Sequence, residues 1–364
     1  MKKKNKAIYL LFLMPFVYFA TACFVVWLVK TSGIYPSGSD TMYHVYRGDY
    51  VYNAIKSGNW YPLYDPAWYN GVEILRYWSP FPAYVMAFCQ YLAGGSQFGA
   101  YLFYIGGVCF LGACVWPFIG LLWFFMPNNL CAIFIEGNLA RSLSMIFLPV
   151  FIYSVYKYLY NHKLRYIPLM VFTFLLMELC HLGYAGMVAI AVIIYGIVYI
   201  IQKGRKKAVL DVVISMIFGF MLLGIWLVAS LRGGITSLDN SENMANFFQN
   251  LWITINPFER LTRGFEYFYF GFATLVVIVF GILFGYKKSR TGFVTGFIIL
   301  LMTTKSAYAV LKHLPGSQYL WMLRFISIAL CMILMSFLMW DRLKKTLVLM
   351  LCVLLVVDTI PSLS

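Results

Sequence analysis

The segment at residues 37–50 contains the residue types that catalysis and ligand binding most often need. Asp40, His44 and Arg47 follow a Ser-Gly-Ser turn at positions i, i+4 and i+7, and this spacing puts their side chains on one face of a helix. A carboxylate, an imidazole and a guanidinium held side by side can take a proton, share a metal ion and bind a phosphate. The alternative is that Asp40 only stabilises the first turn of an interfacial helix while the other two pair locally.

The same loop continues beyond this segment through residues 58–80, which are rich in aromatic side chains and begin with the pair Trp60 and Tyr61. Tryptophan and tyrosine concentrate at membrane interfaces because their rings are amphipathic. Their flat faces also stack on sugar rings. An aromatic belt and a carbohydrate contact are therefore both open interpretations.

Further ionisable residues lie at the ends of apolar runs: Glu136 and Arg141 flank Gly137-Asn138, His181 follows Glu178 by three positions, and Arg324 lies about one turn into an apolar helix. Placing a charged group near hydrocarbon costs free energy, so a charged residue at such a position suggests a functional role. The alternatives are structural networks that lock neighbouring helices, and an Arg324 side chain that extends to lipid headgroups.

The elements that position these residues are apolar helices. The chain has 364 residues, of which 62% are hydrophobic and 11% charged, too few polar residues to cover a soluble protein of this size. Spans need about 20 mostly apolar residues. We therefore predict an all-α, polytopic transmembrane protein of about eleven spans, forming a single transmembrane domain over residues 1–364.

The net charge of +15 is concentrated in short loops, which fits membrane topology and not nucleic-acid binding. The basic clusters fall at residues 2–6, 157–165, 203–207, 287–290 and 342–345. Excess Lys and Arg in short loops mark the cytoplasmic side. The N-terminus is then cytoplasmic, and the long polar segments at residues 31–79 and 232–267 become outer loops. The first of these carries the amphipathic interfacial helix.

Other features of the sequence argue against zinc and nucleotide-binding sites. The eight cysteines lie in apolar runs without metal-type pairing, so they are interpreted as packing residues. The first apolar run exceeds the length of a signal core and is expected to remain as a span. The sequence contains no phosphate-binding glycine loop, no His-Glu-x-x-His and no zinc-type cysteine spacing.

The order of several short motifs resembles a known family. These motifs are Gly38-Ser39-Asp40-Thr41-Met42-Tyr43-His44, Tyr61-Pro62 through Asn70-Gly71, Glu136-Gly137-Asn138-Leu139-Ala140, Glu178-Leu179-Cys180-His181, and Gln318 through Phe325. In this order they resemble bacterial multi-spanning membrane proteins labelled 6-pyruvoyl-tetrahydropterin synthase-related. Those proteins are in turn similar to the GT-C superfamily of polyprenyl-phosphate-dependent glycosyltransferases.

The resemblance implies a GT-C-like enzyme of the bacterial plasma membrane that acts in cell-envelope polysaccharide biosynthesis. It would move a sugar from a polyprenyl-phosphate donor to a cell-surface glycan at the outer membrane face. By this analogy Asp40 would be the general base or a metal ligand, with His44 and Arg47 beside it, and Arg324 would bind the donor phosphate. The cofactor is unknown; a divalent metal ion, if one is used, would be held by Asp40 and His44.

The remaining candidates for substrate binding are Trp60, Tyr61, Glu136, Arg141 and His181. The expected partners are membrane lipid, the polyprenyl-phosphate donor and the glycan acceptor. Two alternatives stay open: a non-enzymatic transporter of glycolipid or polysaccharide, and a membrane subunit of an exopolysaccharide assembly system. A transporter would place its ionisable residues along a path through the bilayer, whereas an enzyme would gather them in one outer pocket.

Overall fold

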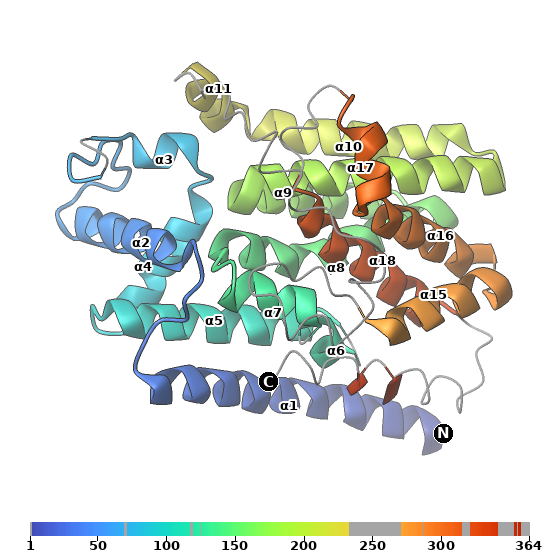
Figure 1. The fold of residues 1–364 in the computed structure, drawn as a ribbon, viewed down its shortest axis with the longest axis horizontal. Coiled ribbons are helices and arrows are strands. Elements are labelled where there is room, and N and C mark those ends of the chain that lie inside the picture. The colour runs from blue at the N-terminus through green and yellow to red at the C-terminus, as the bar shows by residue number, and fades with distance from the viewer. Residues whose placement is uncertain are drawn as a thin grey trace.

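The computed structural model describes residues 2–68, 71–116, 119–124, 126–232, 271–285, 287–314, 321–340, 353–354 and 356–357. The named elements in these ranges are all helical (Figure 1), so the predicted all-α class is confirmed. Beyond Arg232, the expected outer loop at 232–267 lies outside the described residues, as does most of the last expected span.

The helices are numbered along the chain as in Figure 1. In order they are α1 (Lys2–Ser32), α2 (Thr41–Lys56), α3 (Ile74–Tyr77), α4 (Phe81–Leu92), α5 (Gln97–Cys114), α6 (Gly120–Phe124), α7 (Pro127–Phe134), α8 (Leu139–Asn161), α9 (Tyr166–Lys203), α10 (Lys206–Leu222), α11 (Gly224–Arg232), α15 (Phe272–Phe284), α16 (Lys287–Met302), α17 (Lys305–Leu311), the 3-10 turn η2 (Met322–Arg324) and α18 (Phe325–Leu338).

Several of these helices are long and apolar enough to cross a membrane. Within the described residues they are Phe12–Ser32 of α1, together with α5, α8 and α9; the pair α10 and α11, bent by 65°, makes a fifth candidate if it counts as one span. Large apolar side chains on α1, including Phe12, Phe16 and Trp27, are exposed, as expected for a surface that faces lipid.

Some expected spans are shorter or more broken than the sequence predicts. The run that begins at Pro80 forms α4, whose 12 residues extend only about 18 Å. The run from Phe98 to Met126 ends its first helix at Cys114 and continues as the short α6. Apolar composition alone does not distinguish a full span from a short helix buried against its neighbours.

Helix α9 doubles back on itself. Its backbone leaves helical geometry at His181, with φ −156° and ψ 93°. The ring of Tyr166, at its beginning, lies 6.3 Å from that of Tyr153, and the hydroxyl of Tyr199, near its end, donates to the carbonyl of Leu159 at 2.6 Å. A straight helix would separate the two ends by about 50 Å. The apolar runs on either side of this break, Ile167 to Cys180 and Gly183 to Ile201, predict one span outward and the next span inward.

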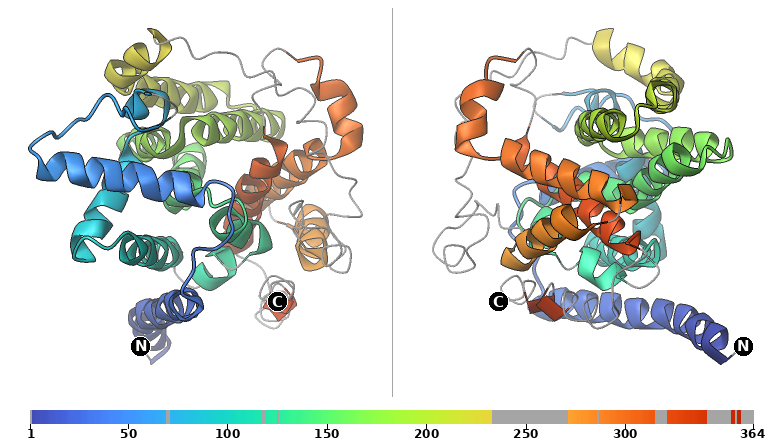
Figure 2. Two further views of the ribbon diagram at one scale, coloured as in Figure 1. Left: turned by 60° about the vertical axis from the view of Figure 1, so that its left-hand side comes forward. Right: turned by 90° about the vertical axis from the view of Figure 1, so that its right-hand side faces the viewer.

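The first outer segment is folded against one end of the helical bundle. Residues Val51, Ile74, Leu75, Ala83 and Ala87 form a small apolar core of their own that joins α2, α3 and α4. A main-chain pairing between Asp65 and Val72 closes the loop between α2 and α3. Figure 2 shows α2 lying across this end of the bundle, with α1 at the edge of the molecule.

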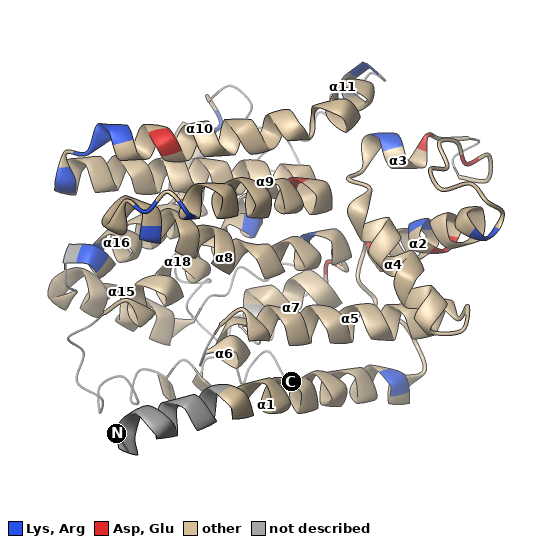
Figure 3. Cartoon of the chain, turned by 180° about the vertical axis from the view of Figure 1, so that it is seen from behind, with Lys and Arg blue, Asp and Glu red and all other residues tan. Residues whose placement is uncertain are grey.

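Charged residues divide between the two ends of the bundle (Figure 3). The turns after α8 and α9 carry Lys163, Arg165, Lys203, Arg205 and Lys206. Most of the described acidic residues lie at the opposite end, near α2 and α3. Since α8 has 23 residues and extends about 34 Å, the two groups are separated by roughly the thickness of a bilayer core.

Candidate functional site

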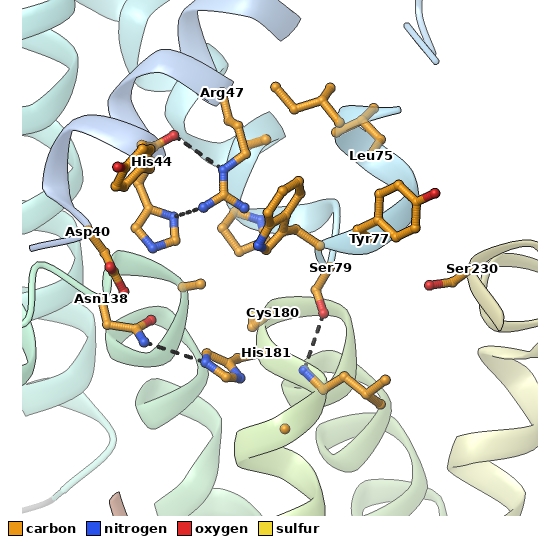
Figure 4. A pocket seen from close by; sticks show the side chains of 18 of the residues that line it. Asp40, His44, Arg47, Leu75, Tyr77, Ser79, Asn138, Cys180, His181 and Ser230 are labelled. Carbon is orange, nitrogen blue, oxygen red and sulfur yellow. Dashed lines mark hydrogen bonds between the residues drawn. The ribbon is translucent and has the colours of Figure 1, made fainter. Parts of the chain in front are cut away.

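A cavity of about 490 Å³ lies at the end of the bundle opposite the basic turns. It is formed by α2, α3, the first turn of α8, the break in α9, α11 and η2. The polar and ionisable groups in its wall include Asp40, His44, Arg47, Asn138, His181 and Arg324. Figure 4 shows the labelled members of this set, which come from α2, α8 and α9, pointing toward a common space. The volume falls in the usual range of small-molecule sites.

The main chain before α2 is held against the break between α7 and α8. The N–H of Ser39 donates to the carbonyl of Ile135 at 3.3 Å, and the hydroxyl of Ser39 donates to the carbonyl of Glu136 at 3.0 Å. Gly137 has φ +63°, and a Cβ there would lie 2.2 Å from the Thr41 hydroxyl oxygen. Only glycine suits this combination of positive φ and close approach.

Helix α2 presents Asp40, His44 and Arg47 on one face, as their spacing predicts. Arg47 donates through Nη2 to Nδ1 of His44 at 3.3 Å and through Nε to the carbonyl of Tyr43 at 3.2 Å. Because a guanidinium can only donate, Nδ1 of His44 accepts and its ring carries the proton on Nε2. Burial and the neighbouring Arg47 charge place the pKa of His44 well below its usual value of 6.5, so the ring is a neutral hydrogen-bond donor.

Asp40 is the carboxylate in the cavity wall, at the N-cap position of α2. Burial raises the pKa of Asp40 above its ordinary value, while the charges of Arg324 and Arg47 act in the opposite direction. A carboxylate with a raised pKa is a stronger base than one in water. Asp49, the next acid on α2, accepts from Nε2 of Gln90 at 2.6 Å and is not among the cavity-lining residues.

Next to the cavity, the carboxylate of Glu136 contacts the guanidinium groups of Arg141 and Arg324. Glu136 accepts from Nη2 of Arg141 at 2.8 Å, and its other oxygen lies 3.7 Å from Nε of Arg324. Arg141 is fully buried, and neither its Nε nor its Nη1 has a hydrogen-bond partner among the described residues. The group of three therefore carries a net positive charge next to the cavity.

His181 and Asn138 bring two helix starts together at the floor of the cavity. Asn138 is the N-cap of α8 and accepts from the N–H of Arg141 at 2.9 Å. His181 accepts from the N–H of Tyr184 at 3.1 Å and so caps the second half of α9. Nε2 of His181 lies 3.5 Å from Nδ2 of Asn138 and 3.4 Å from Nη1 of Arg324. The sequence places Asn138 at a helix break but does not indicate its role in a site.

The aromatic wall of the cavity consists of residues other than the expected pair. Trp68 and Trp78 stack with ring centroids 6.0 Å apart, and the Arg47 guanidinium lies 4.9 Å from the Trp78 ring centroid. Trp60 and Tyr61 do not line the cavity and are 71% and 46% exposed. All four residues occur in one aromatic-rich loop, so composition alone does not identify the pair that turns inward.

The residues of this site do not fit a metal ion. In the described ranges, no group of three or more His, Cys, Asp or Glu side chains could hold one. To bind a metal through Nε2, His44 would need its proton on Nδ1, which faces the Arg47 donor. We therefore derive no step through a metal at Asp40 and His44.

The fold and the site define a helical membrane protein with a polar cavity at one end of its bundle. A family described as "6-pyruvoyl-tetrahydropterin synthase related domain; membrane protein" matches residues 75–364. The chain belongs to this family, and its expected membrane location is confirmed. No curated protein and no solved structure matches the chain.

Proposed function

We propose that this chain is a membrane-embedded glycosyltransferase of the GT-C type. It moves a sugar from a polyprenyl-phosphate donor to a cell-surface glycan at the outer face of a bacterial plasma membrane. The observation that carries this proposal is one cavity lined by a half-buried carboxylate, Asp40, by cationic Arg47 and Arg324, and by indole rings. These are the groups that a base, a leaving phosphate and a sugar require.

In the proposed reaction, Asp40 removes the proton from an acceptor hydroxyl. The acceptor oxygen forms a bond to the anomeric carbon as the bond from that carbon to the phosphate oxygen breaks. The leaving lipid phosphate keeps the electron pair of the broken bond, and the proton stays on Asp40. Because burial raises the pKa of Asp40, its ionised form is well suited to take that proton.

Positive charge beside the cavity would stabilise the departing phosphate. Arg47 is buried, and burial lowers its pKa to about 10, so it remains charged at neutral pH. Arg141 and Arg324 share one carboxylate, Glu136. Fixed cations in a site of low polarity stabilise developing negative charge more strongly than water does.

The aromatic wall supports a carbohydrate as the group that is moved. Trp68 and Trp78 line the same cavity as Asp40. The Tyr77 ring lies at 85° to that of Trp78, with centroids 6.3 Å apart. Such rings bind the apolar face of a sugar while polar groups nearby fix its hydroxyls.

An outer-face location and a path of about eleven spans belong to the same proposal. The basic turns after α8 and α9 lie at the end of the bundle away from α2 and α3, which line the cavity, and Lys and Arg in short loops mark the cytoplasmic side. Labelling of single cysteines in intact cells tests this placement. Ser57→Cys on the loop after α2 is expected to react with an impermeant reagent, and Arg205→Cys only after permeabilisation; the reverse pattern would place the cavity in the cytoplasm.

The grouping of ionisable residues favours an enzyme over a transporter. Asp211 lies near the basic turns, where it accepts from the hydroxyl of Tyr158 at 2.6 Å, in a second pocket with Arg205 and Lys206. The pocket at Asp211 and the cavity at Asp40 share no lining residue. A reaction site at one membrane face accounts for this separation more directly than a continuous path does.

The test is transfer from a labelled polyprenyl-phosphate sugar in membranes that contain the full chain. Asp40→Asn is expected to lower the transfer rate at least 100-fold, since it removes the base but keeps the size of the side chain. Asp49→Asn is the matched control on the same helix, because its amide oxygen can still accept from Gln90. Equal rates in wild type and Asp40→Asn, at equal expression, would remove Asp40 from the mechanism.

A further inference from the structure

The floor of the cavity holds hydrogen-bond donors whose orientation is fixed by helix capping. The Oδ1 atom of Asn138 accepts from the N–H of Arg141 at 2.9 Å. This bond directs the Nδ2 donor of the same amide away from α8 and toward the cavity. The residue is only 3% exposed, so bulk water is not available to pair with that donor.

His181 is fixed in the same way. Its Nδ1 atom lies 3.1 Å from the N–H of Tyr184, a backbone group that can only donate. An imidazole that accepts at Nδ1 carries its proton on Nε2. The Nε2 atom of His181 is therefore a donor, and an imidazolium form would place a second proton against the Tyr184 N–H.

Three donors consequently face one another without an acceptor between them. Nε2 of His181 lies 3.5 Å from Nδ2 of Asn138 and 3.4 Å from Nη1 of Arg324. None of these atoms can accept, so neither contact is a hydrogen bond. Unpaired buried donors cost free energy, about 1 to 3 kcal/mol each. An oxygen atom that accepts from all three would remove this cost.

The surroundings favour an anionic oxygen. In the part of the chain that the structure describes, Glu136 is the carboxylate that Arg324 and Arg141 share. Helix α8 and the second half of α9 both begin in this region, and helix N-termini attract anions. Asp40, the carboxylate of the cavity wall, lies beside Asn138 (Figure 4), and Arg47 lies on the same face of α2. The guanidinium groups of Arg47, Arg141 and Arg324 still outnumber the carboxylates of Asp40 and Glu136.

We propose that His181, Asn138 and Arg324 form a binding site, called the seat below, for one oxygen of a phosphate group. This inference rests on the proposed function for its ligand: the phosphate is that of the polyprenyl donor or product. His181 acts here as a neutral donor and takes no proton, and Asn138, which lies in one of the short motifs, acts as a binding residue.

The test uses variants that keep each helix cap while removing the donor. Asn138→Asp and His181→Asp retain an oxygen that can accept from the Arg141 or Tyr184 N–H, since aspartate is a good N-cap. Each replaces a donor by a negative charge. Asn59→Asp is the matched control, because Asn59 also accepts from a backbone N–H, that of Tyr61 at 3.2 Å, in an exposed loop.

The measurement is equilibrium binding of radiolabelled undecaprenyl phosphate to the full chain in nanodiscs, with undecaprenol as the uncharged comparison. Asn138→Asp and His181→Asp are each expected to weaken binding of the phosphate at least tenfold, and Asn59→Asp less than twofold. Competition by millimolar inorganic phosphate would support a seat that recognises the phosphate group alone. Loss of binding in the cap variants without such competition would support a seat for the lipid-linked phosphate.

Equal binding of undecaprenol and undecaprenyl phosphate would overturn the proposal. So would unchanged phosphate binding in both cap-retaining variants. The thermal unfolding midpoint of each variant is measured as a control. A midpoint within a few degrees of that of wild type shows that a loss of binding does not come from a loss of folding. The binding measurement uses no acceptor and involves no sugar transfer. The phosphate site can therefore be shown wrong while Asp40-dependent transfer is observed, and transfer can be absent while phosphate binding is observed.

Discussion

The main-chain N–H of Asp40 donates to the carbonyl oxygen of Glu136 at 2.9 Å. This bond joins the beginning of α2 to the break between α7 and α8, two segments that are distant in sequence. It places the Asp40 carboxylate near Arg324, whose Nε atom lies 3.7 Å from the Glu136 side chain. The position of the proposed base is thus set by the same residue that holds the cations behind the cavity.

Gly137→Ala is expected to disrupt this junction. A Cβ at Gly137 would lie 2.6 Å from the N atom of Thr41 and 2.2 Å from its hydroxyl oxygen, and the positive φ adds strain for alanine. The segment at residues 38–41 must then move away from α8. We expect transfer to fall at least tenfold with only a modest change in thermal stability, measured on the purified chain. Gly58→Ala, also at positive φ but with no atom near its Cβ position, is the control and should keep its activity.

The rate of transfer is expected to fall on the acid side at a pH above the ordinary aspartate range. Only ionised Asp40 can accept the acceptor proton, and burial raises the pKa of this carboxyl above 3.8. The same shift has a consequence for stability. Above the folded-state pKa the protein must bury a charge that the unfolded chain exposes, so Asp40→Asn should be more stable than wild type at neutral pH. Below pH 3.8 this advantage should disappear.

A pH profile of kcat/KM, together with thermal unfolding of both proteins, checks both expectations. A fall in kcat/KM that occurs only at or below pH 3.8 would contradict the role of Asp40 as a base with a raised pKa. Titration of His44 should not change kcat/KM near pH 6.5, because burial and the Arg47 charge keep the pKa of His44 well below 6.5.

Trp78→Leu is expected to weaken transfer about 5- to 30-fold, mainly through a higher KM for the sugar donor. The indole lines the cavity and lies beneath the Arg47 guanidinium at 4.9 Å, and loss of such an aromatic contact costs about 1 to 2 kcal/mol. Trp60→Leu makes the same chemical change at a 71% exposed position outside the cavity. Equal effects of the two substitutions would argue against a sugar-binding role for Trp78.

Glu136→Gln is expected to lower the stability of the folded protein by about 3 to 5 kcal/mol, because it leaves buried Arg141 without its carboxylate. The double variant Glu136→Gln/Arg141→Met should recover part of that loss, since it also removes the buried charge. Thermal unfolding in one detergent, with all variants side by side, measures the difference. A double variant less stable than Glu136→Gln would show that the ion pair is not the main source of the cost.

The sequence by itself determined the class of the protein and the local shape of its site. The high apolar fraction and the basic turns predicted an all-helical membrane chain. The spacing of Asp40, His44 and Arg47 predicted their common face on α2, and Glu136-Gly137-Asn138 predicted a helix break. These features depend on residues close together in the chain, whose periodicity and backbone preferences act locally.

Only the tertiary structure decided which distant residues meet. Trp78 rather than Trp60 lines the cavity because α3 and α4 pack onto α2 through their own apolar core. His181 meets Arg324 because α9 reverses at the His181 break, and the directions of its two ring nitrogens follow from the Tyr184 cap. Packing between segments far apart in sequence controls these contacts, and a local pattern of residue types does not encode it.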